Sequence, residues 1–138
     1  MQGAEALERF AAARVARLAT VRPDGRPHLV PVVFAFDGSE IVTAIDSKPK
    51  RSKDLARLAN IRSSPFVSLL VDDYREEWPS LWWVRVDGAA RVVDQDPAGT
   101  AALTDKYPQY RQDPPPGPVI RIAIEVVSSW SWAAGTHL

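Results

Sequence analysis

Six runs of β-branched and other apolar residues constrain this chain more than any other feature. Arg22-Pro23-Asp24-Gly25 and Asp37-Gly38 supply the turn residues that join the first three runs as hairpins. Strands joined largely by hairpins favour a small antiparallel barrel, and closing the sheet removes its exposed edges. We therefore expect a mainly β fold with short helices and six strands, at residues 15–21, 26–36, 41–45, 66–71, 81–93 and 119–127.

Helical patterns occur only at the margins of these runs. Residues 3–14 carry Leu7, Phe10 and Ala11 at helical spacing. Residues 97–110 form a second predicted helix, with Pro97 in its first turn. Gly88 is the expected bend or bulge of the long run 81–93. No repeat or linker divides the chain, so residues 1–138 are expected to form a single domain.

Composition excludes several kinds of protein. The 138 residues contain 17 basic and 17 acidic side chains, and this balance disfavours a general nucleic-acid or membrane-surface binder. The absence of cysteine excludes disulfides, thiolate metal sites and cysteine nucleophiles. The N-terminus does not resemble a signal peptide, and no apolar run is long enough to span a bilayer. The simplest expectation is a cytoplasmic protein.

Residues 41–60, IVTAIDSKPKRSKDLARLAN, contain the strongest candidate for an anion site. A predicted strand is followed by a basic loop and then by a helix with Ser52 as its N-cap and Asn60 at its end. A helix start offers unpaired N–H groups and partial positive charge to a phosphate. The cations crowd into six residues: Lys48, Lys50, Arg51 and Lys53. The alternative interpretation is a solvated basic turn.

Two further strand segments are candidates for ligand contact. Pro31 removes a backbone donor from its strand, which indicates either a ligand-facing segment or a plain bulge. Trp82 and Trp83 are adjacent in a predicted strand, so they should point to opposite faces. An outward tryptophan is readily buried by a flat ring or by a second subunit. The alternative interpretation is that both residues serve the core or a dimer contact and do not touch a cofactor.

Side chains typical of self-sufficient catalysis are scarce. The only histidines are His28, which is more typical of a structural role, and His137 near the C-terminus. No spacing resembles a metal site, and the acidic pairs at 72–73 and 76–77 are typical of a solvated loop. No catalytic residue can be named. If the protein is an enzyme, a bound cofactor is expected to supply the chemistry.

Three segments together resemble a known family. ARLATVRPDGRPHLVPVVF, IVTAIDSKPKRS and LWWVRVDGAARVV resemble the split-barrel flavoproteins similar to pyridoxamine-phosphate oxidase, and within them the actinobacterial deazaflavin-dependent oxidoreductases. The resemblance runs from about residue 14 to 93 and resumes over 119–132. True pyridoxamine-phosphate oxidases end in a Trp-Arg-Leu-type segment, whereas this chain ends in WSWAAGTHL, so pyridoxal phosphate synthesis is not expected.

The resemblance implies an FMN-binding-like split barrel that forms a homodimer with its cofactor in the subunit cleft. The implied cofactor is coenzyme F420, with FMN as the alternative, and the implied reaction is hydride transfer to a small organic substrate. The phosphate of the cofactor would bind Lys50 and Arg51, with Lys48 and Ser52 nearby. The cofactor ring would lie near the second and third strands, and the partner subunit would contribute from the long fifth strand. The matching residues are Pro31, Val32, Thr43, Ala44 and Ile45 for the ring, and Trp82, Trp83 and Arg85 for the partner.

Two other functions remain open from the sequence. A non-catalytic F420 carrier of the same fold has the same binding residues, and turnover with reduced cofactor would separate it from an enzyme. A single-stranded nucleic-acid module also combines a small barrel with aromatics and basic loops, but zero net charge speaks against it. We expect no nucleic-acid or membrane partner.

Overall fold

The computed structural model describes residues 1–45 and 51–134, with side chains for residues 1–45 and 56–133. Its strands form one antiparallel sheet in the order β2-β1-β5-β6-β7-β4-β3. The helices are α1 (Gly3–Ala12), α2 (Arg51–Ser63), α3 (Pro97–Lys106) and α4 (Pro108–Gln112), with short 3₁₀ turns η1 (Trp78–Ser80) and η2 (Trp132–Ala134). The strands are β1 (Ala16–Val21), β2 (Pro27–Val32), β3 (Ala35–Asp37), β4 (Glu40–Ala44), β5 (Phe66–Asp73), β6 (Trp82–Val93) and β7 (Val119–Ser131).

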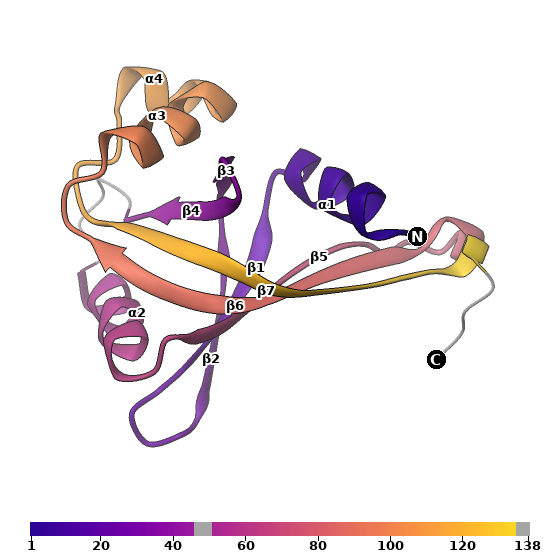
Figure 1. The fold of residues 1–138 in the computed structure, drawn as a ribbon, viewed down its shortest axis with the longest axis horizontal. Helices are drawn as coiled ribbons and strands as arrows, with labels where there is room; N and C mark the ends of the chain where they lie inside the picture. The colour runs from indigo at the N-terminus through magenta and orange to yellow at the C-terminus, as the bar shows by residue number, and fades with distance from the viewer. Residues whose placement is uncertain (46–50, 135–138) are drawn as a thin grey trace.

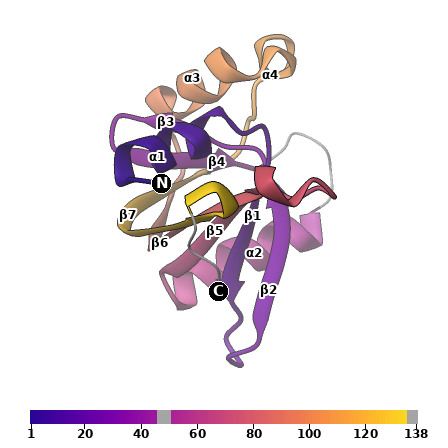
Figure 2. The same cartoon turned by 90° about the vertical axis from the view of Figure 1, so that its right-hand side faces the viewer.

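The sheet curls into a partly closed barrel with helices at its ends (Figures 1 and 2). α3 and α4 lie at one end, α2 lies at the opposite end, and α1 lies beside the long β6–β7 pair. Alternate side chains of each strand point inward, and Leu18, Leu69, Val86 and Ile122 are fully buried. Phe10 of α1 joins this core, with its ring centroid 5.0 Å from that of Phe34. The predicted antiparallel split barrel is therefore confirmed.

The predicted strand 26–36 is two strands in the structure, which gives seven strands instead of six. β2 and β3 form the two edges of the sheet, and the chain passes from one edge to the other through Val33 and Phe34. Because these two residues lie outside the ladder, another group must satisfy their backbone. Tyr107 does so for Phe34: its hydroxyl accepts the N–H of Phe34 at 3.1 Å and donates to the carbonyl oxygen of Phe34 at 2.8 Å. Thr43 does so for Val33, because its hydroxyl donates to the Val33 carbonyl oxygen.

Three glycines lie at the two hairpin turns and at the bulge of β6. Gly25 and Gly38 have φ of 88° and 62°, which confirms the two predicted turns. The β6–β7 register shifts between Asp87 and Gly88, as expected for a bulge. A Cβ at Gly88 would collide with the carbonyl oxygen of Ala123, so the two strands approach each other there too closely for a side chain.

All three predicted helices differ from their predicted bounds, and α1 ends at Ala12 instead of residue 14. α2 begins at Arg51 and continues to Ser63, so Ser52 is inside the helix and not its N-cap, and Asn60 does not end it. Asn60 is buried and donates to Thr20 Oγ1 at 3.1 Å, and the buried Ile61 extends the apolar face of the helix. The predicted helix 97–110 is divided before Pro108, because the residue before a proline is held in extended backbone.

β5, β6 and β7 extend beyond the barrel as a long ribbon (Figure 1). The ribbon is longer than predicted, since β7 continues to Ser131. At its tip the rings of Trp78 and Trp132 lie 5.9 Å apart. None of the described helices has the length and apolar character that crossing a membrane requires.

Candidate functional site

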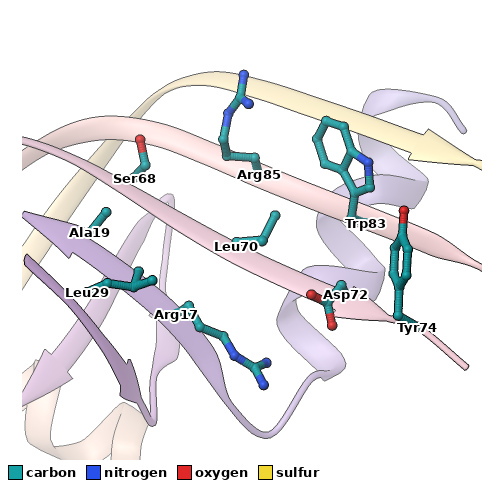
Figure 3. A pocket seen from close by; sticks show the side chains of 9 residues that line it. All are labelled: Arg17, Ala19, Leu29, Ser68, Leu70, Asp72, Tyr74, Trp83 and Arg85. Atoms are coloured by element: carbon teal, nitrogen blue, oxygen red, sulfur yellow. The ribbon is translucent and has the colours of Figure 1, made fainter. Parts of the chain in front are cut away.

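A hollow of about 500 Å³ lies on the outward face of β2, β1, β5 and β6 (Figure 3). The strand period of two places every second residue of these strands on this face. We call this site the Trp83 hollow, and it is lined by Arg17, Ala19, Leu29, Ser68, Leu70, Asp72, Tyr74, Trp83 and Arg85. Its walls are largely apolar and aromatic, with charged groups around them, which is the usual composition of a small-molecule site.

The aromatic wall of the hollow comes from the ends of β5 and β6. Trp83 and Tyr74 stand there side by side in Figure 3. Trp82 points the other way: it packs against the core, and the guanidinium of Arg9 lies 5.3 Å from its ring centroid. The expectation that the two adjacent tryptophans face opposite sides is confirmed, and it is Trp83 that faces the hollow.

Two arginines supply positive charge to the hollow. Arg85 lies 5.7 Å from the Trp83 ring centroid, donates to Asp87 Oδ2 at 3.2 Å and reaches Ser128 Oγ at 3.4 Å. Arg17 is exposed and makes no hydrogen bond or ion pair with another described residue. Arg85 is therefore fixed in place, whereas the donors of Arg17 are available to a ligand.

Three large apolar side chains are exposed on the sheet face around the hollow. Leu29 is 66% exposed, Phe66 64% and Val126 53%, and all three lie on the outward face of their strands. Large apolar patches on a soluble domain usually mark an interaction site. This face is therefore a candidate for both a ligand and a protein contact.

Of the five predicted ring-contacting residues, the structure places only Pro31 beside this hollow. Pro31 is exposed and pairs with Arg17 in the β1–β2 register, so it lies at the rim. Val32, Thr43 and Ala44 are buried, and Thr43 Oγ1 donates to the carbonyl oxygen of Val33 at 2.7 Å. Ile45 is half-buried, and its N–H donates to the Pro118 carbonyl at 3.3 Å. The side chains of these last four residues do not line the hollow.

The predicted phosphate site falls largely outside the described residues. Lys48 and Lys50 lie in the stretch 46–50, and only the backbone is described for Arg51 and Ser52, at the start of α2. The predicted order of strand, basic segment and helix start is confirmed, since β4 ends at Ala44 and α2 begins at Arg51. The phosphate contact itself stays a prediction.

Several lining residues were missed in the sequence. Ser68 and Leu70 line the hollow because only one face of β5 packs on the core, and the nearly continuous apolar run 66–71 does not show which residues face outward. Arg17 interrupts the apolar run of β1, and this was a usable signal for an outward-facing functional residue. Tyr74 follows β5 and has no periodic signal at all.

Three polar side chains at the end of α3 and in α4, and the histidine of β2, have structural surroundings. Tyr107 is buried, Tyr110 packs edge-on against it, and Arg111 donates to the carbonyl oxygens of Thr104 and Asp105 at the end of α3. His28 faces inward from β2. Burial, together with Arg22 and Arg57, lowers the pKa of His28, so the side chain is neutral at pH 7.

Comparison with known proteins gives a family for this fold. Residues 3–131 match the family described as pyridoxamine 5'-phosphate oxidase. A conserved hypothetical protein from Mycobacterium tuberculosis is 25% identical, with a TM-score of 0.78, over 100% of this chain and 90% of that chain. A search of curated proteins finds no match.

Two further similar structures are proteins that bind FAD. One, from Mesorhizobium loti, is 24% identical with a TM-score of 0.70, over 94% of this chain and 92% of that chain. The other, from Mycobacterium smegmatis, is 19% identical with a TM-score of 0.63, over 94% of each chain. At these identities the likeness shows a shared fold. Because the match at residues 3–131 spans nearly the whole sheet and its helices, this chain belongs to the pyridoxamine 5'-phosphate oxidase family.

Proposed function

We propose that this protein is an oxidoreductase that binds a flavin-type cofactor at the Trp83 hollow. The observation that carries the proposal is the hollow itself, where an outward tryptophan and a fixed arginine stand on an exposed apolar sheet face. Its family and the two FAD-binding proteins of similar fold support the same class of cofactor. When bound, such a cofactor supplies hydride transfer, which the side chains of the hollow cannot supply.

The residues present fit a flat, polar-edged ring. Trp83 and Tyr74 offer aromatic surface, and Leu29 and Leu70 offer aliphatic surface, against which such a ring would be shielded from water. Arg17 and Arg85 offer N–H donors to the oxygen atoms at the edge of a ring or to a phosphate. The basic segment with Lys48, Lys50 and Arg51 would hold the phosphate of the cofactor.

Within this class we propose coenzyme F420 as the cofactor, with FMN or FAD as the alternatives, and a homodimer that closes the hollow. The observation that supports a homodimer is the exposed apolar side chains around the hollow, including Leu29, Phe66 and Val126. A second copy on this face would bury these side chains and narrow an otherwise open site. The substrate would be a small organic molecule that enters beside the ring.

The test is a cofactor titration of protein purified without added cofactor. F420, FMN and FAD are titrated separately, and binding is followed by cofactor fluorescence. We expect saturable binding, tightest for F420. Tighter binding of FMN or FAD would reassign the cofactor, and no binding of any of the three would overturn the proposed function. Oxidation of the reduced, bound cofactor by a panel of small acceptors then separates an enzyme from a carrier.

A pair of substitutions tests whether the cofactor binds at the Trp83 hollow. Trp83→Leu should weaken binding about two- to tenfold, because an aromatic contact contributes roughly 0.5–1.5 kcal/mol beyond its buried area. The matched control is Trp78→Leu, since Trp78 is 60% exposed at the ribbon tip and does not line the hollow. Equal effects of the two substitutions would place the cofactor elsewhere.

A further inference from the structure

The floor of the Trp83 hollow consists of three rows of side chains that run across β1, β5 and β6. The register of these strands sets each row, because residues paired across a ladder point to the same face. From the aromatic end, the rows are Asp72 with Trp83, then Arg17 with Leu70 and Arg85, and then Ala19 with Ser68 and Asp87. Leu70 therefore lies between the aromatic wall and the row that contains Ser68, as Figure 3 shows.

Asp87 holds two side chains of the hollow without lining it. Ser68 Oγ donates to Asp87 Oδ1 at 2.5 Å, and Arg85 Nε donates to Asp87 Oδ2 at 3.2 Å, so each carboxylate oxygen fixes one neighbour. Hydrogen bonds to an ionised carboxylate are stronger than those between neutral groups. Asp87 itself lies next to the bulge, where the β6–β7 register shifts. The orientation of both Ser68 and Arg85 thus depends on one carboxylate.

The hydroxyl of Ser68 faces the hollow as an acceptor. A carboxylate can only accept, so the single hydroxyl proton of Ser68 points to Asp87, and only the oxygen lone pairs remain for a ligand. Arg85, in contrast, has only donors. Its Nε serves Asp87 and its Nη2 serves Ser128, while its Nη1 forms no hydrogen bond with a described residue. The hollow therefore presents an acceptor and a donor close to each other, on neighbouring strands.

The charge of this polar wall is balanced. The carboxylate of Asp87 forms an ion pair with Arg85, and the lone pairs of Ser68 would repel an anion. The wall therefore suits a neutral ligand group that carries an N–H beside a carbonyl oxygen. Arg17 lies on the other side of Leu70 and has no ion pair with a described residue, so it is better placed for an anionic group.

We propose that Ser68 and Arg85 bind the imide edge of a flat ring, and that Asp87 is the positioning residue for both. Ser68 Oγ accepts the imide N–H, and Arg85 Nη1 donates to the adjacent carbonyl oxygen. The inference rests on the proposed function, because flavins and deazaflavins share this edge, which is a ring nitrogen between two carbonyl groups. The rest of the ring then lies over Leu70 toward Trp83, so the wall also fixes the orientation of the ring in the hollow.

The test compares each cofactor with a derivative that carries a methyl group on the imide nitrogen. FMN, FAD, F420 and their methylated forms are titrated into the full chain, purified without cofactor, and binding is followed by fluorescence. For any cofactor that binds, methylation should weaken affinity for the wild type by about tenfold or more, because it removes the N–H that Ser68 accepts. In Ser68→Ala the methylated form should bind within about threefold of its parent, since no acceptor is left unpaired.

Failure of the imide contact differs from failure of the proposed function. If a cofactor binds and methylation has an equal effect in the wild type and in Ser68→Ala, the imide contact is overturned and the flavin-type site stands. If none of the three cofactors binds, the proposed function fails, and the imide contact fails with it.

Two further variants separate ligand recognition from stability of the sheet. Ser80→Ala is the matched control and should keep the full methylation effect, because Ser80 also donates to a carboxylate, that of Glu77 at 3.0 Å, but does not line the hollow. Asp87→Asn keeps the side-chain shape without its charge, and it should weaken the parent cofactor about fivefold more than the methylated form. Equal weakening of both forms, or a lower melting temperature with an unchanged methylation effect, would mean that the network only stabilises the sheet and would overturn the proposal.

Discussion

Arg17 is an exposed cation in a position where a barrel strand usually presents a neutral residue to an apolar surface. It pairs across the ladders with Pro31 and Leu70, and no described carboxylate lies within ion-pair distance of its guanidinium. Such a group contributes little to folding and is free to bind an anion or an acceptor on a ligand. At the residue scale this separates it from Arg85, which Asp87 and Ser128 hold in place.

Arg17→Gln should therefore weaken cofactor binding without changing stability. A charge-assisted hydrogen bond contributes roughly 1.5–3 kcal/mol, so we expect a loss of about one to two decades in affinity by fluorescence titration. The control is Arg26→Gln, which removes the same charge from the exposed β1–β2 turn and should leave affinity within about twofold. A normal affinity in Arg17→Gln would remove this residue from the site.

Tyr107 illustrates the opposite case, a polar side chain whose partners are all backbone groups. Tyr107→Phe should lower the free energy of unfolding by roughly 1–3 kcal/mol, because the Phe34 N–H and carbonyl would be left buried without partners. Chemical denaturation measures this change. Tyr74→Phe is the control, since Tyr74 is 59% exposed, and it should change the unfolding free energy by less than about 0.5 kcal/mol. Equal effects of the two substitutions would mean that the Tyr107 hydroxyl does not stabilise the segment between β2 and β3.

At the scale of elements, Asp96 attaches the first turn of α3 to the barrel. Asp96 caps α3 by accepting the Gly99 N–H at 3.0 Å, and it also pairs with Arg121 of β7 at 2.5 Å. Arg121 is only 12% exposed and additionally pairs with Asp37 and Glu40 of the β3–β4 hairpin. The hydrogen bond from Arg121 is the main cause that lowers the pKa of Asp96, and Arg91 does the same for Glu40.

This network predicts acid sensitivity with a definite sign. Because the folded-state pKa of Asp96 is lowered, its contribution is complete above the unfolded pKa of about 3.9 and is lost as pH falls through the folded value. The contribution of Asp96 to the urea midpoint should therefore be nearly constant from pH 7 to 5 and fall below about pH 4. His28, whose folded-state pKa is lowered, adds a separate loss of stability that begins as pH falls through its unfolded pKa of about 6.5.

Two substitutions separate the helix cap from the ion pair. Asp96→Asn keeps a capping oxygen and should cost roughly 1–3 kcal/mol at pH 7, with a weaker acid dependence than the wild type. Asp96→Ala should cost about 1 kcal/mol more, because it also removes the cap. If the urea midpoint of Asp96→Asn falls with pH in the same way as that of the wild type, other carboxylates control the acid sensitivity.

At the scale of the whole molecule, the exposed apolar sheet face predicts self-association. We expect a dimer by sedimentation at micromolar concentration, and we expect Phe66→Glu to produce a folded monomer because Phe66 is 64% exposed in one chain. Gln109→Glu adds the same charge on α4 and should leave the dimer intact. A wild-type monomer, or a Phe66→Glu protein that remains dimeric, would place the second copy elsewhere or exclude it.

The sequence by itself determined those features that depend on local chemistry. Gly25 and Gly38 adopt the positive φ that their turns require, Gly88 marks the bulge, and the alternation of Trp82 and Trp83 assigns them to opposite faces. Short segments of the sequence also carried the family resemblance, and the match of residues 3–131 to that family confirms it. Such features follow from steric limits and from the strand period of two, which act over a few residues.

Only the tertiary structure decided how strands distant in the sequence combine. Residues 26–36 form two strands because β2 and β3 pair with different neighbours at opposite edges of the sheet. The Trp83 hollow takes Arg17 from β1, Leu70 from β5 and Trp83 from β6, and no local pattern states that these strands are adjacent. Likewise, Lys106 acquires its lowered pKa only because α3 packs its end against Phe34 and the end of α1. Burial and strand order are set by contacts across the whole chain, so the sequence pattern alone does not contain them.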